Sequence, residues 1–371
     1  MRILFAGGGT GGHLYPGLAI ARALVQLDPA VHPFFVGARR GIEREVLPHS
    51  GFEHVLLDLH PFYRASPWQN WTTLAGLARS WSTIGRAVQS ERPAVAVGTG
   101  GYASGPPLAY ALAHRIPIVL QEQNSYPGLT TRALARFARE IYLGYAEAAG
   151  HLRSRAAAWM EETGNPIEPP PDVRPDVAQT RIRWGFPPSP EEGRVVLIFG
   201  GSQGARSLND AVSRWLMSAF PERVFVIWGT GRSEYERLRH HATDRIRVLP
   251  YLSPIADAYA IADLALTRAG ALTLAELCAW GIPAVLVPLP TAAADHQTAN
   301  ARALAASGGA VMLSQADLTV EHLERTLGSL LGDTGRLTEL SRAASARARP
   351  RAAETIARRI LTLAQFKQVG T

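Results

Sequence analysis

Cysteine and lysine are almost absent from this sequence. Among 371 residues there is one cysteine, Cys278, and Lys367 is the only lysine among the 38 basic residues. A single cysteine cannot form an internal disulfide, which excludes a small secreted scaffold held together by disulfides. Apolar cores must stabilise the chain instead, and 47% hydrophobic residues over this length are enough for two domains of ordinary size.

Long apolar runs are absent as well. No stretch reaches the roughly 18 uncharged apolar residues that a membrane-spanning helix needs. The opening, MRILFAGGG, has a basic residue and a short apolar run, but glycines interrupt it at once. A secretory signal needs a longer apolar region and a cleavage site of small residues. We therefore expect a first buried strand here and a cytoplasmic protein.

Motifs for metals and nucleic acids are also missing. No Asp-x-Asp pattern occurs, and the scattered histidines lack the spacing of a zinc site. The formal charge of +7 is spread over both halves, without the basic arm of many nucleic-acid-binding proteins. We expect no metal, no other cofactor and no nucleic-acid partner, although the positive charge admits an anionic partner.

Short apolar runs alternate with helix-length segments along the chain. Most runs are continuously apolar, as in strands buried on both faces of a parallel sheet. Between them, apolar residues recur at three- and four-residue spacing, which is typical of amphipathic helices. This alternation predicts an α/β fold with parallel sheets. The expected strands are 2–6, 32–36, 94–97, 116–121, 140–143, 195–199, 224–227, 246–249, 264–267 and 284–287.

A proline-rich segment divides the chain. Eight prolines lie between residues 164 and 190, too many for helices or central strands, so this segment is predicted to be a linker with one short helix near 177–184. After it, Arg194-Val-Val-Leu-Ile-Phe-Gly-Gly repeats the pattern of Arg2-Ile-Leu-Phe-Ala-Gly-Gly. The repeat predicts two Rossmann-like domains, 1–163 and 164–345. The final helix, about 346–371, could pack on either domain.

Three glycine-rich turns, 7–13, 98–102 and 200–206, follow expected strands. Glycine lets the backbone approach a ligand closely, and a helix N-terminus offers N–H groups to negative charge. Open α/β sheets bind ligands at this edge, so a phosphate-rich ligand is the natural match. No Gly-Lys-[Ser/Thr] follows, which excludes a nucleoside-triphosphate loop. A dinucleotide site expects an acidic residue at the end of the second strand, but this strand ends Val36-Gly-Ala-Arg39. NAD-type chemistry is therefore disfavoured, and a phosphorylated dinucleotide is the only version of it that Arg39 would admit.

Seven motifs then occur in an order that identifies a family. They are Gly7-Gly-Gly-Thr-Gly-Gly-His-Leu-Tyr-Pro16, Gly100-Gly-Tyr-Ala-Ser-Gly-Pro106, Glu122-Gln-Asn-Ser-Tyr-Pro-Gly-Leu-Thr130, Gly164-Asn-Pro166, Gly200-Gly-Ser-Gln-Gly-Ala-Arg206, Arg268-Ala-Gly-Ala-Leu-Thr273 with Glu276, and Asp295-His-Gln-Thr-Ala-Asn-Ala301. From Met1 to about Gly309, the sequence closely resembles the MurG family of bacterial N-acetylglucosaminyltransferases.

The resemblance implies the glycosyltransferase-B fold, with two Rossmann-like domains facing a central cleft. It implies inverting transfer of N-acetylglucosamine from UDP-N-acetylglucosamine to the MurNAc 4-hydroxyl of lipid I, the MurNAc-pentapeptide on undecaprenyl pyrophosphate. The product is lipid II with a β-1,4 linkage, for peptidoglycan synthesis. The family acts as a peripheral protein at the cytoplasmic face of the cell membrane.

Such a displacement needs a base for the acceptor hydroxyl and stabilisation of the leaving UDP. His13, which closes the first glycine turn, is the predicted base; alternatively it caps the turn or binds a pyrophosphate oxygen. Glu122 is the competing catalytic candidate. Gln121 stands where the family usually has histidine, so a proton transfer by that histidine cannot be indispensable if this protein is active.

The resemblance also assigns substrate contacts. Glu276 grips the ribose hydroxyls, and a carboxylate suits two vicinal hydroxyls. Ser202, Gln203 and the Gly201 backbone face the diphosphate. Leu252 would lie against uracil, with its backbone bonded to the edge of the base, and Gln297 and Asn124 would contact the sugar. The full set of substrate-binding candidates is Thr10, Gly11, Gly12, Tyr102, Asn124, Gly201, Ser202, Gln203, Tyr251, Leu252, Arg268, Leu272, Thr273, Glu276 and Gln297.

One further departure concerns the diphosphate. After Gly164-Asn-Pro166 the family often continues with valine and an arginine that holds the donor, but here Ile167 and Glu168 follow. An acid would repel the diphosphate, so that role is not carried over; Arg174 or Arg206 are the candidate substitutes.

A tryptophan-rich stripe predicts the membrane contact. At helical spacing Trp71, Leu74 and Trp81 share one face, with several arginines close by. Aromatic and apolar residues flanked by arginine suit a helix on an anionic membrane surface. The alternative is that the stripe belongs to the core.

Three other functions remain open at this stage. The first is a glycosyltransferase-B enzyme acting on another lipid acceptor, such as a diacylglycerol. The second is a UDP-N-acetylglucosamine 2-epimerase, and the third is a membrane-bound nucleotide-sugar binder without activity.

Overall fold

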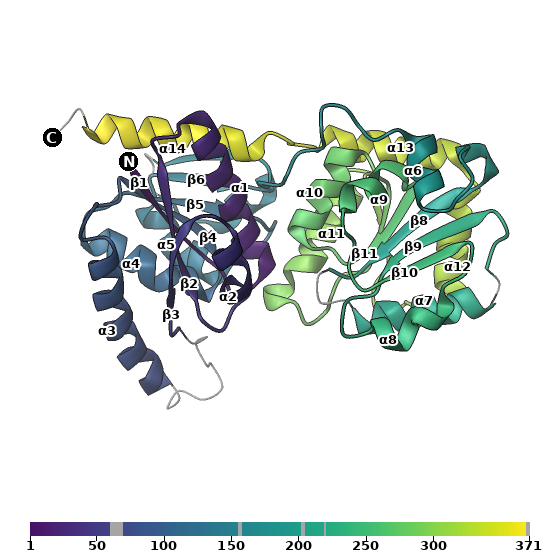
Figure 1. Cartoon of the computed structure of the whole chain (residues 1–371), viewed down its shortest axis with the longest axis horizontal. Coiled ribbons are helices and arrows are strands. Elements are labelled where there is room, and N and C mark those ends of the chain that lie inside the picture. Colours follow the sequence, from purple (N-terminus) through teal and green to yellow (C-terminus); the bar gives the residue numbers. More distant parts are fainter. Residues whose placement is uncertain (60–69, 155–157, 202–204, 219, 369–371) are drawn as a thin grey trace. The chain divides into compact units, whose positions relative to one another are not determined.

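The computed structural model describes residues 1–59, 70–154, 158–201, 205–218 and 220–368, with the backbone alone for 70–78 and 366–368. The chain forms two compact units (Figure 1). The first comprises residues 1–168 and 349–371, and the second comprises 169–348. The sequence-based boundaries lay at 163/164 and 345/346, close to these divisions.

The first unit is built on a seven-stranded parallel sheet of order β3-β2-β1-β4-β5-β6-β7. Its strands are β1 (Arg2–Gly7), β2 (His32–Ala38), β3 (Glu53–Leu57), β4 (Val95–Gly100), β5 (Ile118–Glu122), β6 (Glu140–Leu143) and β7 (Trp159–Glu162). Its helices are α1 (Gly11–Leu27), α2 (Glu43–Val46), α3 (Asn70–Ala87), α4 (Gly105–Ala113), α5 (Leu129–Leu134) and α14 (Ala352–Gln368).

Both faces of this sheet are covered, which explains its continuously apolar strands. Successive side chains of a strand point to opposite faces. Accordingly, Ile3 of β1 packs with α1 and α14, whereas Leu4 packs with Ile84 of α3 and Leu108 of α4. The sequence left open which domain holds the final helix; Ile356 and neighbouring residues of α14 bury their side chains in the first unit.

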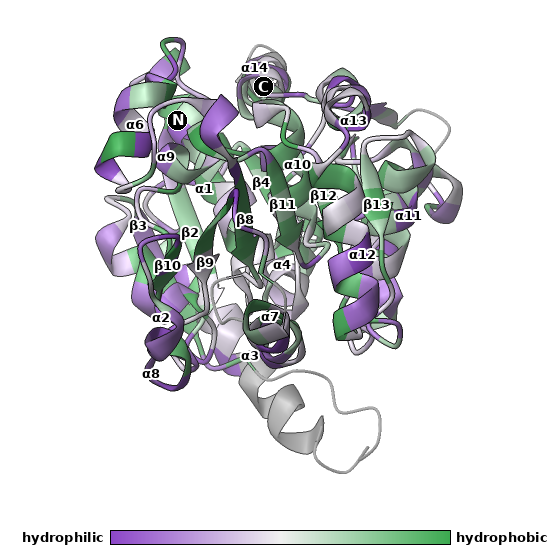
Figure 2. Cartoon of the chain, turned by 90° about the vertical axis from the view of Figure 1, so that its right-hand side faces the viewer, coloured by the Kyte–Doolittle hydropathy of each residue, from purple (hydrophilic) through white to green (hydrophobic). Residues whose placement is uncertain are grey.

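The second unit has a six-stranded parallel sheet of order β10-β9-β8-β11-β12-β13. Its strands are β8 (Arg194–Phe199), β9 (Val224–Gly229), β10 (Ile246–Leu249), β11 (Leu264–Thr267), β12 (Ala284–Leu286) and β13 (Ala310–Met312). Its helices are α6 (Val177–Arg183), α7 (Arg206–Ser218), α8 (Tyr235–Leu238), α9 (Ile255–Ile261), α10 (Ala271–Trp280), α11 (His296–Ala306), α12 (Val320–Leu331) and α13 (Thr334–Ala346). Figure 2 shows β8 and β11 as strongly hydrophobic.

The ten predicted strands all occur, within a few residues at their ends. The short helix predicted near 177–184 is α6, where the Asp176 side chain caps the N-terminus by accepting a 2.8 Å hydrogen bond from the Gln179 N–H. The sequence reading missed β3, β7 and β13, which are edge strands. Edge strands are short and partly exposed, so polar residues such as Glu161 of β7 break the apolar run that signals a central strand.

The described helices include none with both the length and the apolar character that a bilayer crossing demands.

Candidate active site

The strand order of each sheet reverses at one point, between β1 and β4 in the first unit and between β8 and β11 in the second. Loops that leave the carboxyl ends of these strands diverge, and open α/β sheets bind their ligands there. The predicted glycine turns follow β1, β4 and β8, so they lie at these reversal points. The second turn begins later than the sequence suggested, since residues 98–100 still belong to β4.

His13 is held where the first two glycine turns meet. Its Nδ1 lies 3.0 Å from the Thr10 hydroxyl, and its carbonyl accepts a 2.6 Å hydrogen bond from Thr99 at the end of β4. Gly100 and Gly101 have φ of 91° and 78°, and a Cβ on Gly100 would lie 2.9 Å from the His13 ring. Glycine is therefore required at β4 to admit the imidazole.

The other candidates of the first turn surround this histidine. Thr10 and Gly12 are exposed and Gly11 is half-buried at the start of α1. The Tyr102 ring is half-buried and covers the turn, because a Cβ on Gly9 would come within 2.6 Å of it. The structure thus brings the predicted residues of β1 and β4 together on one edge.

An acidic residue that the sequence did not point to forms a hydrogen bond with the backbone of this turn. Glu43 of α2 is completely buried, and its Oε1 accepts hydrogen bonds from the N–H groups of Gly9 (2.9 Å) and Ala38 (3.0 Å). Gly8 and Gly41 leave it room, since a Cβ on either would overlap its carboxylate. The sequence reading found no acid at the end of β2; the structure supplies one, but it is buried and bonded to the backbone.

Glu122 is engaged in organising its own loop. It is 2% exposed, and its Oε1 accepts hydrogen bonds from the Asn124 backbone (3.1 Å) and side-chain amide (3.2 Å). Its Oε2 accepts a 3.0 Å bond from the Gly128 N–H. Both oxygens therefore hold the 122–128 loop, and with it the half-buried Asn124.

Gln121 belongs to a buried network of amides. Its side chain donates to the Asn165 side chain (3.3 Å) and accepts from Gln123, which also donates to the Thr99 carbonyl (2.8 Å). The Asn165 amide donates to the Gln123 carbonyl (2.9 Å). Position 121 thus carries a side chain that does not titrate. The network ends at Thr99, whose hydroxyl donates to the His13 carbonyl.

In the second unit, Arg268 lies at the end of β11 and is 5% exposed. It donates to the carbonyls of Val287 (3.0 Å) and Pro288 (3.1 Å), and to Ser207 Oγ and Gln315 Oε1 at 2.7 Å each. Burial lowers the pKa of its guanidinium. Because Ser207 lies in the first turn of α7, a buried cation is attached to the helix N-terminus that follows the third glycine turn.

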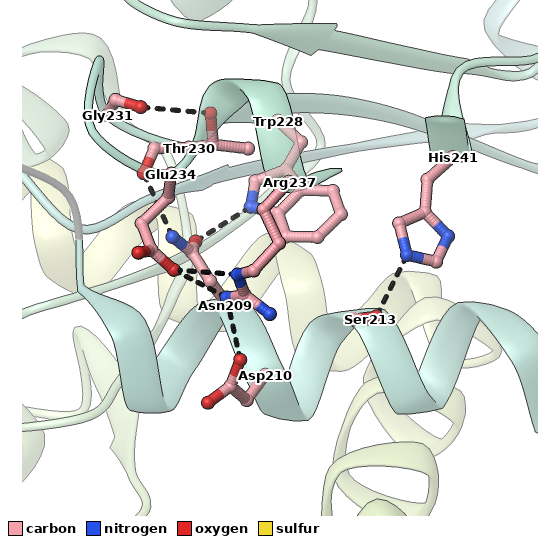
Figure 3. Close-up of polar contacts among 9 residues, drawn as sticks. All are labelled: Asn209, Asp210, Ser213, Trp228, Thr230, Gly231, Glu234, Arg237 and His241. Carbon is pink, nitrogen blue, oxygen red and sulfur yellow. Dashed lines mark hydrogen bonds and ion pairs between the residues drawn. The ribbon is translucent and has the colours of Figure 1, made fainter. Parts of the chain in front are cut away.

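A second set of contacts also fixes α7 (Figure 3). The Asn209 side chain accepts a 3.0 Å hydrogen bond from the Trp228 indole and donates a 2.9 Å bond to the Thr230 carbonyl. Asn209 and Thr230 are fully buried. The first turn of α7 is therefore pinned to the carboxyl end of β9 as well as to that of β11.

Glu276 on α10 has a buried partner that the sequence reading missed. The Tyr259 hydroxyl donates a 2.7 Å hydrogen bond to its Oε2, and burial raises the pKa of Tyr259 well above its usual value. Gln297, at the start of α11, accepts a 3.0 Å bond from the Leu289 N–H. Leu272 and Thr273 are half-buried in the first turn of α10.

The remaining candidates of the second unit differ in exposure. Tyr251 is 51% exposed, whereas the Leu252 side chain is buried and packs over Gly229. Gly201 is exposed with φ 93°. Ser202 and Gln203 lie outside the described residues. Within the described ranges, no group of three or more His, Cys, Asp and Glu converges to hold a metal ion.

Arg174, a candidate substitute for the missing family arginine, contacts the end of α10. It donates to the carbonyls of Trp280 (3.1 Å) and Ala279 (3.0 Å), and its guanidinium lies 4.8 Å from the Trp280 ring centre. It therefore caps the C-terminus of α10. Arg206, at the start of α7, is exposed, as is Glu168.

Only part of the tryptophan stripe can be described. Trp81 on α3 is 39% exposed, and its ring makes a T-shaped contact with Tyr110 with centroids 5.1 Å apart. Arg79 and Arg86 on the same helix are exposed. The side chains of Trp71 and Leu74 lie outside the described residues.

The chain matches known proteins over almost its whole length. The glycosyltransferase family 28 N-terminal domain matches residues 3–143, and the family 28 C-terminal domain matches residues 195–356. The UDP-N-acetylglucosamine--N-acetylmuramyl-(pentapeptide) pyrophosphoryl-undecaprenol N-acetylglucosamine transferase of Salinibacter ruber is 42% identical over 370 residues, which cover 98% of this chain and 96% of that protein. The protein of the same name from Prosthecochloris aestuarii is 39% identical, covering 99% of this chain and 100% of that protein.

A solved structure agrees. The crystal structure of Acinetobacter baumannii MurG superposes with a TM-score of 0.76 at 28% identity, covering 97% of this chain and 99% of that one. The predicted glycosyltransferase-B fold, with two parallel-sheet units, is thereby confirmed. With both family domains matched in order and relatives similar from end to end, this chain belongs to glycosyltransferase family 28 and is a glycosyltransferase.

Proposed function

We propose that this enzyme transfers N-acetylglucosamine from UDP-N-acetylglucosamine to the MurNAc 4-hydroxyl of lipid I. The transfer inverts the anomeric centre and yields lipid II for peptidoglycan synthesis. The observation that carries the proposal is the 42% identity, over 98% of the chain, to a transferase whose name states this donor sugar and a pyrophosphoryl-undecaprenol acceptor. The positions of His13 and Arg268 at the two reversal points support it.

His13 is the base in this proposal. It lies at a ligand-binding edge, and Thr10 at its Nδ1 orients the ring. Glu122 suits the role less well, because both its carboxylate oxygens accept hydrogen bonds from its own loop. We assign Glu122 to holding the 122–128 loop that presents Asn124 to the sugar. A positioned base contributes roughly 10²–10⁴-fold to such a reaction.

The second unit holds the donor. Glu276 binds the ribose hydroxyls, and the N-terminus of α7, with Arg268 behind it, neutralises the diphosphate as UDP leaves. A helix N-terminus attracts anions through its free N–H groups. Gln297 and the 251–252 backbone complete the contacts to sugar and uracil.

The acceptor places the enzyme at a membrane. We propose peripheral binding to the anionic cytoplasmic face of the cell membrane through α3, with Trp71, Leu74 and Trp81 as the apolar contact and Arg79 and Arg86 as the basic one.

One assay separates the proposal from its rivals. UDP release from UDP-N-acetylglucosamine is measured with and without a lipid I analogue, and the sugar products are analysed. Strictly analogue-dependent release is expected. Release of UDP with diacylglycerol but not with the analogue would indicate an enzyme for another acceptor. Conversion of UDP-N-acetylglucosamine without any acceptor would indicate an epimerase. Tight binding of UDP-N-acetylglucosamine without release of UDP would indicate a non-enzymatic binder.

The same assay tests the base. His13→Ala is expected to lower kcat by roughly 10²–10⁴-fold while leaving UDP affinity within about twofold, because the donor binds to the other unit. Glu122→Gln removes the charge and keeps one of the two acceptor oxygens, and it is the comparison once circular dichroism shows that the variant is folded. A larger kcat loss in Glu122→Gln than in His13→Ala would reverse the assignment.

A further inference from the structure

Arg268 carries a buried charge that no acidic side chain of the described residues neutralises. Its hydrogen-bond acceptors in this part of the chain are uncharged: two backbone carbonyls, the Ser207 hydroxyl and the Gln315 amide oxygen. Among the described residues, no Asp or Glu forms an ion pair with it, and burial alone accounts for the lowering of its pKa. Burying an unpaired charge is costly, so such an arrangement calls for a reason.

Two other buried arginines, Arg2 and Arg181, interact with acidic side chains. Arg2, which is 4% exposed, pairs with Glu53 at 2.7 Å. Arg181, which is 1% exposed, also bonds to carbonyls, but the carboxylates of Asp263 and Glu192 act on it and raise its pKa against the effect of burial. The charge of Arg268 is thus compensated less than theirs.

Gln315 determines this difference. It follows β13, and its Oε1 accepts from the Arg268 guanidinium at 2.7 Å and from the Ser207 hydroxyl at 2.9 Å. A glutamate of the same shape could accept both bonds equally well, but it would cancel the charge. The side chain therefore joins Arg268 to the first turn of α7 and adds no negative charge there.

We propose that Gln315 is a positioning residue that keeps the Arg268 charge uncompensated, so that this charge acts with the α7 N-terminus on the donor's diphosphate. The inference rests on the proposed function, because it takes the ligand at α7 to be a nucleoside diphosphate. Gln315 then contributes to the higher affinity for UDP than for uridine, and it has no part in recognising the base or the ribose.

The test is Gln315→Glu in the full-length chain, with UDP and uridine affinities measured by calorimetry or competition. The new carboxylate pairs with Arg268, so the melting temperature should be unchanged or higher. Affinity for UDP should fall about 10-fold, the order expected for the loss of one partly screened unit charge, and uridine affinity should stay within about twofold. A merely structural role would not separate the two ligands.

Two matched variants complete the design. Ala316→Glu adds the same charge to the same loop at an exposed position, where water screens it, and should leave the UDP-to-uridine ratio unchanged. Gln315→Met removes the acceptor without adding charge and should keep the ratio within about threefold. If Gln315→Glu does not fold, Arg268→Met removes the charge by another route and should lower the ratio similarly.

The possible results distinguish a failure of the proposed function from a failure of the role assigned to Gln315. Wild-type protein that binds neither UDP nor UDP-N-acetylglucosamine would contradict the proposed function. Wild-type protein that prefers UDP, with a folded Gln315→Glu variant of unchanged UDP-to-uridine ratio, would overturn the inference and leave the function standing. An equal drop in Ala316→Glu would likewise overturn it.

Discussion

The Tyr259 hydroxyl donates a 2.7 Å hydrogen bond to Glu276 Oε2 and thereby fixes the carboxylate assigned to the donor ribose. Tyr259 is 3% exposed and contacts Trp280 with ring centroids 5.7 Å apart, so its own position is set by the core. Because burial and Glu276 raise the pKa of Tyr259 well above its usual value, the phenol stays a donor over the whole neutral range.

Tyr259→Phe should weaken donor binding without slowing the chemical step. A hydrogen bond to a charged group contributes about 1.5–3 kcal/mol, and only part of this is expected to appear in binding. We expect the KM for UDP-N-acetylglucosamine to rise about fivefold to 10-fold and kcat to stay within about twofold. Steady-state kinetics check this, with Tyr110→Phe in the other unit as control. A change in kcat alone would contradict the assignment.

Removing Arg359 should destabilise the first unit. Arg359 on α14 forms two bonds to Glu140 (2.7 and 3.1 Å) and lies 3.9 Å from the Trp159 ring centre. The Glu140 side chain is only 11% exposed, so Arg359→Met leaves a nearly buried carboxylate without its cation, although the Tyr142 hydroxyl still donates to it. The loss in free energy of unfolding should be about 2 kcal/mol, less than for a fully buried pair because Arg359 itself is 38% exposed.

The matched control lies one residue away. Arg358 pairs with Glu354 at 2.7 Å, but the two side chains are 63% and 42% exposed. Arg358→Met should therefore change the free energy of unfolding by less than about 0.5 kcal/mol. Urea unfolding measures both variants, and equal effects would refute the special role of the Glu140 pair.

His241 should make stability fall at acidic pH. Its pKa is lowered from its ordinary value by burial and by the neighbouring His240 and Arg237, and its Nε2 lies 2.8 Å from the Ser213 hydroxyl. As the pH falls through the ordinary histidine pKa of 6.5, the unfolded chain takes up a proton before the folded one does. The unfolded state is thereby favoured, and stability is lost below that pH.

The measurement is the melting temperature between about pH 7.5 and about pH 5.5. The drop should be smaller in His241→Gln than in wild type. His32→Gln, at the exposed start of β2, serves as control and should retain the wild-type drop. A His241→Gln variant with an unchanged drop would show that other groups dominate.

The tryptophan stripe predicts membrane binding that is separable from donor binding. Trp71→Ala with Trp81→Ala should weaken binding to anionic liposomes and leave affinity for UDP-N-acetylglucosamine unchanged. Because Trp81 also packs on Tyr110, circular dichroism must first show that the variant is folded. Met217→Ala removes an exposed apolar side chain of the second unit and should bind liposomes normally. Unchanged liposome binding by the double variant would rule out the stripe.

Much of the candidate site could be predicted because its signals are local. The glycine turns are legible in sequence, since close backbone approach and positive φ require glycine at positions such as Gly100. The residues missed, Glu43, Tyr259 and Gln315, carry no local signal. Each acts through a partner that only folding brings near; Gln315 lies 47 residues from Arg268 along the chain.

The sequence by itself determined the two parallel-sheet units and the sheet edges at which the glycine turns lie, because strands buried on both faces must be apolar and tight turns with positive φ require glycine. It left open where the last helix packs, and whether Arg174 or Arg206 replaces the family arginine. Tertiary structure decided the first point, because the side chains of α14 fill the first unit's core, and it showed that Arg174 donates to the carbonyls at the end of α10. Hydrogen bonds and charge compensation depend on which distant groups meet, and only the folded chain specifies that.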